Sequence, residues 1–239
     1  MNLKTTIGKV FIYRKFYRNY LNILLTLYIK GKTNNSSVNV KCKLRDGVKL
    51  EVPSWWVTTY TRLKLVKNTN ISELKLTVNG ISFKFKGIPI IIDPSRFSDL
   101  DAVFFYEDYR FLNTKERDVI DIGMNIGDSS IYFSINGANR VIGLEPFPYA
   151  FSFAEKNVTL NRLNNIILLN AGYGKDSITT IDQKISSSES RLISTTEGKN
   201  IPIFSLKTLI NKYNIYSGIL KIDCEGCEYA LLEEDDDVF

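Results

Sequence analysis

The stretch Val119-Ile-Asp-Ile-Gly-Met-Asn-Ile-Gly127 decides the fold of this 239-residue chain. Its apolar run is interrupted by a carboxylate near its end, two glycines punctuate the loop, and a helix-compatible segment comes next. A second apolar run, Val141-Ile-Gly-Leu-Glu145, then ends in another carboxylate. Glycines in such a loop let the backbone approach a ligand, and the second carboxylate can accept hydrogen bonds from a ribose diol. The pattern predicts a strand–loop–helix–strand unit that binds a nucleotide.

The loop between Gly123 and Gly127 lacks the composition of a phosphate-binding loop. A dinucleotide fingerprint needs a middle glycine where Asn125 stands, and a Walker loop needs a lysine where Asp128 follows the second glycine. Asp121 and Asp128 would also repel a pyrophosphate. Carboxylates suit a ligand that carries ammonium and sulfonium charges, so the expected cofactor is S-adenosyl-L-methionine.

Four motifs, taken in order, resemble the FkbM-type S-adenosylmethionine-dependent methyltransferases. They are DIGMNIGDS from Asp121, GLEP from Gly143, the asparagine pair of residues 157–161, and LKIDCEG from Leu220. The resemblance covers residues 117–232, about half of the chain. It implies a Rossmann-like methyltransferase fold, usually with O-methyl transfer to a sugar or other hydroxyl. For this chain we expect a hydroxyl of a sugar or glycolipid as the acceptor.

Strand and helix patterns alternate after residue 117, which predicts a parallel sheet and an α/β fold class. The expected strands are 119–123, 140–145, 166–171 and 219–223, and the expected helices are 129–136, 149–163 and 206–213. The resembling fold continues for three more strands, whereas this chain stops 239 − 223 = 16 residues after Asp223. We therefore expect a C-terminally shortened class I sheet whose exposed last strand favours a homo-oligomer.

The sequence before this domain is basic and then β-rich. Residues 1–37 are expected to form an amphipathic helix over 16–29 and a linker over 31–37. Residues 38–112 are expected to form a β-rich module, with one hairpin around Asp46-Gly47 and another around Asn79-Gly80. Residues 113–239 are expected to form the Rossmann-like domain.

Residues 1–50 hold eleven Lys and Arg and one acid, a net charge of 11 − 1 = +10, so the remainder carries 5 − 10 = −5. This asymmetry indicates an anionic partner or a solvated basic face. The helix over 16–29 either packs on the protein or a partner subunit, or lies on a membrane surface, giving peripheral contact through residues 1–30. Nucleic acid ranks behind a small-molecule or glycolipid partner.

The candidate cofactor site combines the loop with the ends of the following strands. Asp121 is expected to orient loop amides or to receive the ligand's ammonium group. Gly123, Asn125 and Gly127 would allow close approach, and Asp128 with Ser129 would cap the next helix or contact the ligand.

Three further residues complete the candidate site. Glu145 is expected to accept both ribose hydroxyls, Phe147 to lie against the adenine or in the core, and Asn170 to read the adenine edge.

Attack by an alcohol requires removal of its proton, and the chain contains no histidine. The base is therefore a carboxylate, a lysine or a metal-bound group, and Asp223 is the candidate, with Glu225 and Glu228 nearby. The same acids could hold a divalent cation, but a polar turn explains them as well, and we predict no metal site.

The rival functions are an RNA methyltransferase and a catalytically silent binding or scaffolding module.

Three cysteines and the absence of a secretory signal predict a cytoplasmic location, with peripheral contact at the membrane surface as the alternative. Cys224 and Cys227 are spaced as a redox pair. The surrounding sequence favours two incidental thiols.

Overall fold

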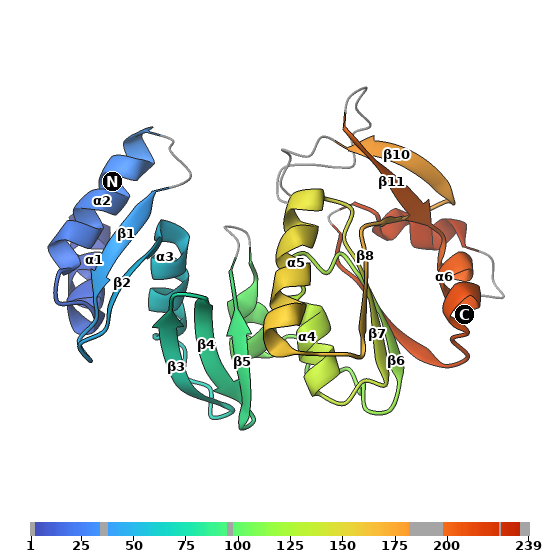
Figure 1. The fold of residues 1–239 in the computed structure, drawn as a ribbon, viewed down its shortest axis with the longest axis horizontal. Helices are drawn as coiled ribbons and strands as arrows, with labels where there is room; N and C mark the ends of the chain where they lie inside the picture. Colours follow the sequence, from blue (N-terminus) through green and yellow to red (C-terminus); the bar gives the residue numbers. More distant parts are fainter. Residues whose placement is uncertain (1–2, 34–37, 95–97, 182–197, 225, 235–239) are drawn as a thin grey trace. The chain divides into compact units, whose positions relative to one another are not determined.

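The computed structural model describes residues 3–33, 38–94, 98–181, 198–224 and 226–234, and its chain divides into two compact units, residues 1–96 and 97–239 (Figure 1). The division lies earlier than the expected boundary at residues 112 and 113. The π-helix η1, Asp101–Tyr106, accounts for the difference because it packs on α4, Asp128–Ile135, with the Phe104 and Tyr132 rings 5.7 Å apart.

The N-terminal unit contains a helical pair, a hairpin with a helix, and a three-stranded antiparallel sheet in the order β3-β4-β5. Its core comes from alternate strand residues such as Val40, Cys42, Phe83 and Phe85, which are buried. The elements are α1 Leu3–Phe16, α2 Tyr20–Thr33, β1 Asn39–Lys43, β2 Lys49–Pro53, α3 Ser54–Leu63, β3 Ile71–Thr77, β4 Gly80–Phe85 and β5 Ile88–Ile92.

The expected single helix over residues 16–29 is wrong, because α1 ends at Phe16 and α2 begins at Tyr20. Tyr17 breaks the helix by pairing with Leu44, and its fully buried hydroxyl lies 3.0 Å from Thr61 Oγ1. The expected linker over 31–37 is wrong at its start, since α2 continues to Thr33; residues 34–37 lie outside the described residues.

Both hairpins form at the expected places. Leu44 N donates to Val48 O at 2.8 Å, so the first loop has three residues that end at Gly47, whose φ is +99°. In the second hairpin Thr77 pairs with Gly80, so the turn is made by residues 78 and 79 and the glycine already belongs to β4.

The C-terminal unit is built on a parallel sheet in the order β12-β6-β7-β8. In Figure 1, helices α4 and α5 cover one face of this sheet and α6 covers the other. The expected Rossmann-like α/β fold is confirmed. The new elements are β6 Asp118–Ile122, β7 Arg140–Leu144, α5 Pro148–Asn161, β8 Ile166–Leu169, α6 Leu206–Tyr213 and β12 Gly218–Ile222.

Alternate residues of the parallel strands supply the core beneath α6. Ile120 and Ile142 of the sheet belong to one buried cluster with Leu206 and Leu209 of the helix. Ser205 starts α6 because its Oγ accepts a hydrogen bond from Thr208 N at 3.1 Å. The apolar runs of the sequence thus form the sheet, and the residue that follows each run is left at its edge.

A second sheet, which the sequence did not indicate, lies beside the parallel one (Figure 1). It comprises β9 Gly172–Tyr173, β10 Ser177–Ile181 and β11 Lys199–Phe204, in the order β10-β11-β9. The 3₁₀ helix η3, Glu228–Glu233, follows β12. In the described part of the chain β12 is an edge strand, and the expected homo-oligomer stays a prediction. No described helix has both the length and the apolar character needed to cross a membrane.

Candidate functional site

The four parallel strands end at one edge of the sheet, and each is followed at once by a residue of the candidate site. Gly123 follows β6, Glu145 follows β7, Asn170 follows β8 and Asp223 follows β12. The carboxyl edge of an open parallel sheet is where such folds bind ligands. The structure therefore brings together residues that are up to one hundred positions apart in the sequence.

The loop after β6 turns through three left-handed residues, Gly123 (φ +73°), Asn125 (φ +50°) and Gly127 (φ +81°). Gly123 lies against the end of β12, where an added Cβ would meet the Asp223 carbonyl oxygen at 2.1 Å. Only glycine fits this position. The N-cap residue of α4 is Gly127, and no side chain makes a capping hydrogen bond at this end of the helix. The expected capping role of Asp128 and Ser129 is therefore wrong.

Asp121 is fully buried beneath this loop. Its Oδ2 accepts hydrogen bonds from Ser129 Oγ at 2.7 Å and Ser130 Oγ at 2.6 Å. Its Oδ1 lies 3.0 Å from Lys221 Nζ, in a contact that is an ion pair without hydrogen-bond alignment. Lys221 also donates to Gly123 O at 2.8 Å. Asp121 therefore fixes the loop to the start of α4 and to β12.

Glu145 holds the same loop from the other side. Its Oε2 accepts from Asn125 N and its Oε1 from Phe147 N, both at 3.0 Å. The side chain is buried, and burial raises the pKa of Glu145 to about 7, against the lowering effect of the two amides and of Lys221. A carboxylate has about four acceptor positions, so each oxygen keeps one for a ligand.

Asp128 is the second buried carboxylate of the site. Its Oδ1 accepts from Ser129 N at 3.1 Å, whereas its buried Oδ2 has no hydrogen-bond partner in the described part of the chain. Burial, followed by the negative charge of Asp99, raises the pKa of Asp128 to about 7. A buried acceptor without a donor is costly in a folded protein and marks a place where a ligand donor would stabilise it.

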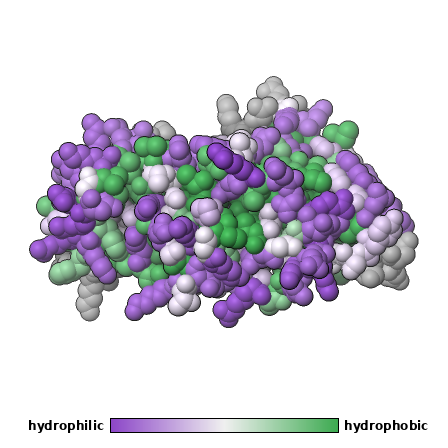
Figure 2. Space-filling view, turned by 60° about the horizontal axis from the view of Figure 1, so that its bottom comes forward, coloured by the Kyte–Doolittle hydropathy of each residue, from purple (hydrophilic) through white to green (hydrophobic). Residues whose placement is uncertain are grey.

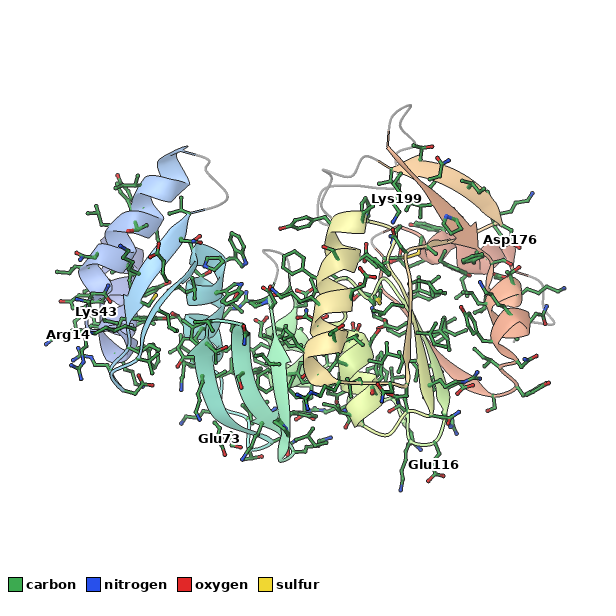
Figure 3. The ribbon with its side chains drawn as sticks, in the orientation of Figure 1. Arg14, Lys43, Glu73, Glu116, Asp176 and Lys199 are labelled. Carbon is green, nitrogen blue, oxygen red and sulfur yellow. A yellow bond between two sulfur atoms is a disulfide. The ribbon has the colours of Figure 1, made fainter. Side chains whose placement is uncertain are left out.

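Phe147 and Asn170 are tied into the protein. Phe147 is buried in a small apolar cluster with Ala150, Ile181 and Ile201. Asn170 Nδ2 donates to the carbonyls of Glu145 and Pro146 at 2.9 and 3.1 Å. Its Oδ1 accepts from Lys199 Nζ at 2.7 Å, and Figure 3 labels this lysine where β11 approaches the sheet. The roles of both residues toward an adenine stay predictions.

Asp223 is exposed at the end of β12, and its Oδ2 accepts from Tyr109 Oη at 3.1 Å. The Tyr109 ring packs on Phe133 and lies 5.8 Å from Lys221 Nζ. Burial and the nearby Asp223 carboxylate raise the pKa of Tyr109, so the phenol remains a donor. Glu228 accepts from Cys224 N and Gly226 N, which makes it a loop-closing residue; Glu225 lies outside the described residues.

Cys224 and Cys227 form a disulfide directly after Asp223. The expectation of two incidental thiols is therefore wrong. The Cα atoms lie 5.6 Å apart, because the turn between β12 and η3 brings them together. The third cysteine, Cys42, is free and buried in the N-terminal unit.

Sequence reasoning missed two residues of this site. Lys221 was detectable, since a charged side chain inside an apolar strand needs a buried partner. Tyr109 gave no signal, because its contact with Asp223 joins residues that are 114 positions apart. Among the described residues, no group of three or more cysteine, aspartate or glutamate side chains is placed to hold a metal ion.

Comparison with known proteins matches residues 121–239 to the family model "Methyltransferase FkbM domain". A protein of Methanocaldococcus jannaschii, described as a putative protein N5-glutamine methyltransferase, is 28% identical over 89 residues, which are 37% of this chain and 41% of that protein.

Two solved structures share weaker likeness. The methyltransferase FkbM of Methylobacillus flagellatus is 17% identical, with 57% of this chain and 33% of that chain covered and a TM-score of 0.35. TYW2 of M. jannaschii in complex with AdoMet is 24% identical, with 42% and 47% covered and a TM-score of 0.30. The chain spans less than half of the length of each of these proteins.

The family match begins at Asp121, the residue that the buried network fixes beneath the loop, and includes Glu145, Asn170 and Asp223. It thus covers the whole carboxyl edge of the sheet except Tyr109. Through residues 121–239, the chain belongs to the FkbM methyltransferase family.

Proposed function

We propose that this chain is an S-adenosylmethionine-dependent methyltransferase that acts on a hydroxyl group of a sugar or glycolipid. One observation carries the proposal: the glycine loop of the cofactor site lies directly against the strand end that carries Asp223. A cofactor on the loop and an acceptor at Asp223 would then be neighbours, and positioning supplies much of the catalysis in such transfers.

The residues present fit this cofactor. Glu145 keeps free acceptor positions for a ribose diol, while the orphan Oδ2 of Asp128 is suited to a cationic donor such as an ammonium group. The loop offers three left-handed residues for close backbone approach, and the carboxylates around it disfavour a pyrophosphate. Phe147 and Asn170 would lie beside the base.

The bound cofactor supplies a methyl group already activated by a sulfonium. The residues of the chain have the simpler tasks of orienting the acceptor and moving one proton. Asp223 would accept the proton of the attacking hydroxyl, because it is an exposed carboxylate at the site and the chain has no histidine. The hydrogen bond from Tyr109 would hold that carboxylate in one orientation.

Amide N-methylation is the second candidate, favoured by the M. jannaschii protein described as an N5-glutamine methyltransferase. Against it stands the sequence after the fourth strand. Asp223-Cys224 occupies the place where an Asn-Pro-Pro-Tyr-like motif would be expected for amino-group chemistry.

The experiment pairs binding with transfer. Calorimetry should show that S-adenosylhomocysteine binds and that NAD and ATP bind far more weakly; equal affinity for NAD would exclude the proposed cofactor. Labelled methyl transfer should then reach a glycolipid extract and not a glutamine-containing peptide. Asp223→Asn should abolish transfer and keep S-adenosylhomocysteine affinity, while the exposed Asp108→Asn should keep both. Transfer to the peptide alone would establish the second candidate.

A further inference from the structure

The side of α2 that faces solvent is apolar. Leu21, Leu25, Tyr28 and Ile29 are 61, 58, 46 and 52% exposed, and their spacing places them on one face of the helix. We call these four residues the α2 stripe. Surface helices normally present polar residues at such positions, so a contiguous exposed apolar stripe marks an interaction surface.

The opposite side of α2 already serves the protein's own core. Ile23, half a turn away from the stripe, is fully buried, and so is Tyr17 just before the helix. The helix therefore has two apolar faces, one buried in the N-terminal unit and one largely exposed. Packing within that unit leaves the α2 stripe in contact with water.

This helical pair also carries exposed positive charge. Lys9, Arg14, Lys15 and Arg18 are exposed on α1 and the turn after it. The Arg18 and Arg45 guanidinium groups donate to the backbone carbonyls of Arg45 and Arg14, which are neutral acceptors and leave the positive charge of both groups in place. Figure 3 labels Arg14 and Lys43 in this unit, and Figure 2 shows hydrophilic and hydrophobic side chains mixed over one face of it.

We propose that the α2 stripe and the exposed basic residues of α1 and of the turn after it bind the surface of an anionic lipid bilayer. An aliphatic stripe with flanking Lys and Arg lies at the boundary between headgroups and acyl chains in interfacial helices. A second copy of this surface would bring its own net charge of +10 from residues 1–50 against an equal charge. The phosphates of a nucleic acid would bind the basic residues, but they would leave Leu21 and Leu25 without an apolar surface to pack on.

The test is sedimentation of the full chain with phosphatidylcholine vesicles, with and without phosphatidylserine. We expect binding only to the vesicles that contain phosphatidylserine, and loss of binding at high salt. Leu21→Asn with Leu25→Asn should lower the partition coefficient about tenfold. Val78→Asn, at another apolar residue that is 70% exposed in the same unit, should leave it unchanged.

Two further sets of variants test the role of charge and an expected gain of binding. Lys9→Gln with Lys15→Gln should lower partitioning, whereas Lys67→Gln with Lys75→Gln, exposed lysines of the same unit, should not. Asn22→Leu widens the exposed stripe and should strengthen binding, which keeps the proposal testable if the double asparagine variant misfolds. Unchanged partitioning in the stripe variant, or a dimer that only this variant dissociates in light scattering, would overturn the proposal.

Discussion

Lys221 and Asp121 are register partners on the neighbouring parallel strands β12 and β6, and their charged atoms lie 3.0 Å apart in the buried interior. Removing two charges from water costs about as much as their attraction returns, so such a pair adds little net stability. Its value is positional, because Lys221 also donates to the Gly123 carbonyl at the start of the cofactor loop.

Removing one partner of this pair should be far more costly than removing both. Lys221→Met leaves a buried carboxylate unpaired, and we expect a loss of about 3–5 kcal/mol in the free energy of unfolding. Adding Asp121→Asn should recover part of the loss. Urea unfolding of the single and double variants measures the coupling, and Lys175→Met, an exposed site, is the control. Strictly additive losses would show that the two charges are independent.

Glu145 is expected to act in both binding and loop order. Glu145→Ala should weaken S-adenosylhomocysteine binding by about 1–3 kcal/mol, the usual range for charge-assisted hydrogen bonds. It should also lower the melting temperature, because the amides of Asn125 and Phe147 lose their acceptor. Calorimetry and thermal unfolding separate the two effects. Glu155→Ala, on the exposed side of α5, should change neither; unchanged affinity in the Glu145 variant would remove this residue from the cofactor site.

Asp128 should make stability depend on pH. Its pKa rises from 3.8 to about 7 on folding, so between these values the folded state binds the proton more tightly. Stability is therefore lost as the pH rises from about 4 to 7. Asp128→Asn should flatten this slope, make the protein more stable than the wild type above pH 7, and weaken S-adenosylmethionine binding. Melting temperatures across this range measure the slope, and an identical slope in the variant would contradict the expectation.

Tyr109 should affect the chemical step more than binding. Tyr109→Phe keeps the ring that packs on Phe133 and removes only the hydrogen bond to Asp223. We expect kcat to fall about tenfold or more, the scale of one hydrogen bond to a charged group, with KM for S-adenosylmethionine unchanged. Tyr106→Phe, at an exposed tyrosine of η1, is the matched control. A rise in KM with constant kcat would assign Tyr109 to binding.

The cysteines should differ sharply in reactivity. Cys42 is 1% exposed and burial raises its thiol pKa to about 12, so it should resist alkylation in the native protein. Cys224 and Cys227 should be labelled only after reduction, because they are joined in a disulfide. Mass spectrometry of native protein with and without reductant counts the labels. Labelling of both without reductant would mean that the disulfide is absent from the purified protein.

The parallel sheet was predictable from sequence because each strand is a largely apolar run with a residue of the candidate site directly after its carboxyl end. Strands of this kind carry their signal locally. The four expected strands and three expected helices agree with the structure to within a few residues at their ends. Glu145 and Asp223 were predictable as residues of one edge for the same reason, since each directly follows such a run.

The features that were missed depend on contacts between distant residues. Tyr17 stops α1 because it pairs with Leu44, although the local sequence continues a helical pattern. In the second sheet β9 has only two residues, and β10 and β11 are separated by residues 182–197, which lie outside the described residues. The spacing of Cys224 and Cys227 is compatible with a disulfide or with two separate thiols. Only the turn after β12, which brings the two residues together, decides between them.

The contact between Gly123 and the Asp223 carbonyl has a consequence for recombination and protein engineering. Two segments that are a hundred positions apart share one interface of bare backbone, so neither can be exchanged alone. In a chimera that takes its loop from one relative and its fourth strand from another, the two backbone segments would not fit each other at this contact. Grafts made at this edge of the sheet therefore have to carry both segments from the same parent.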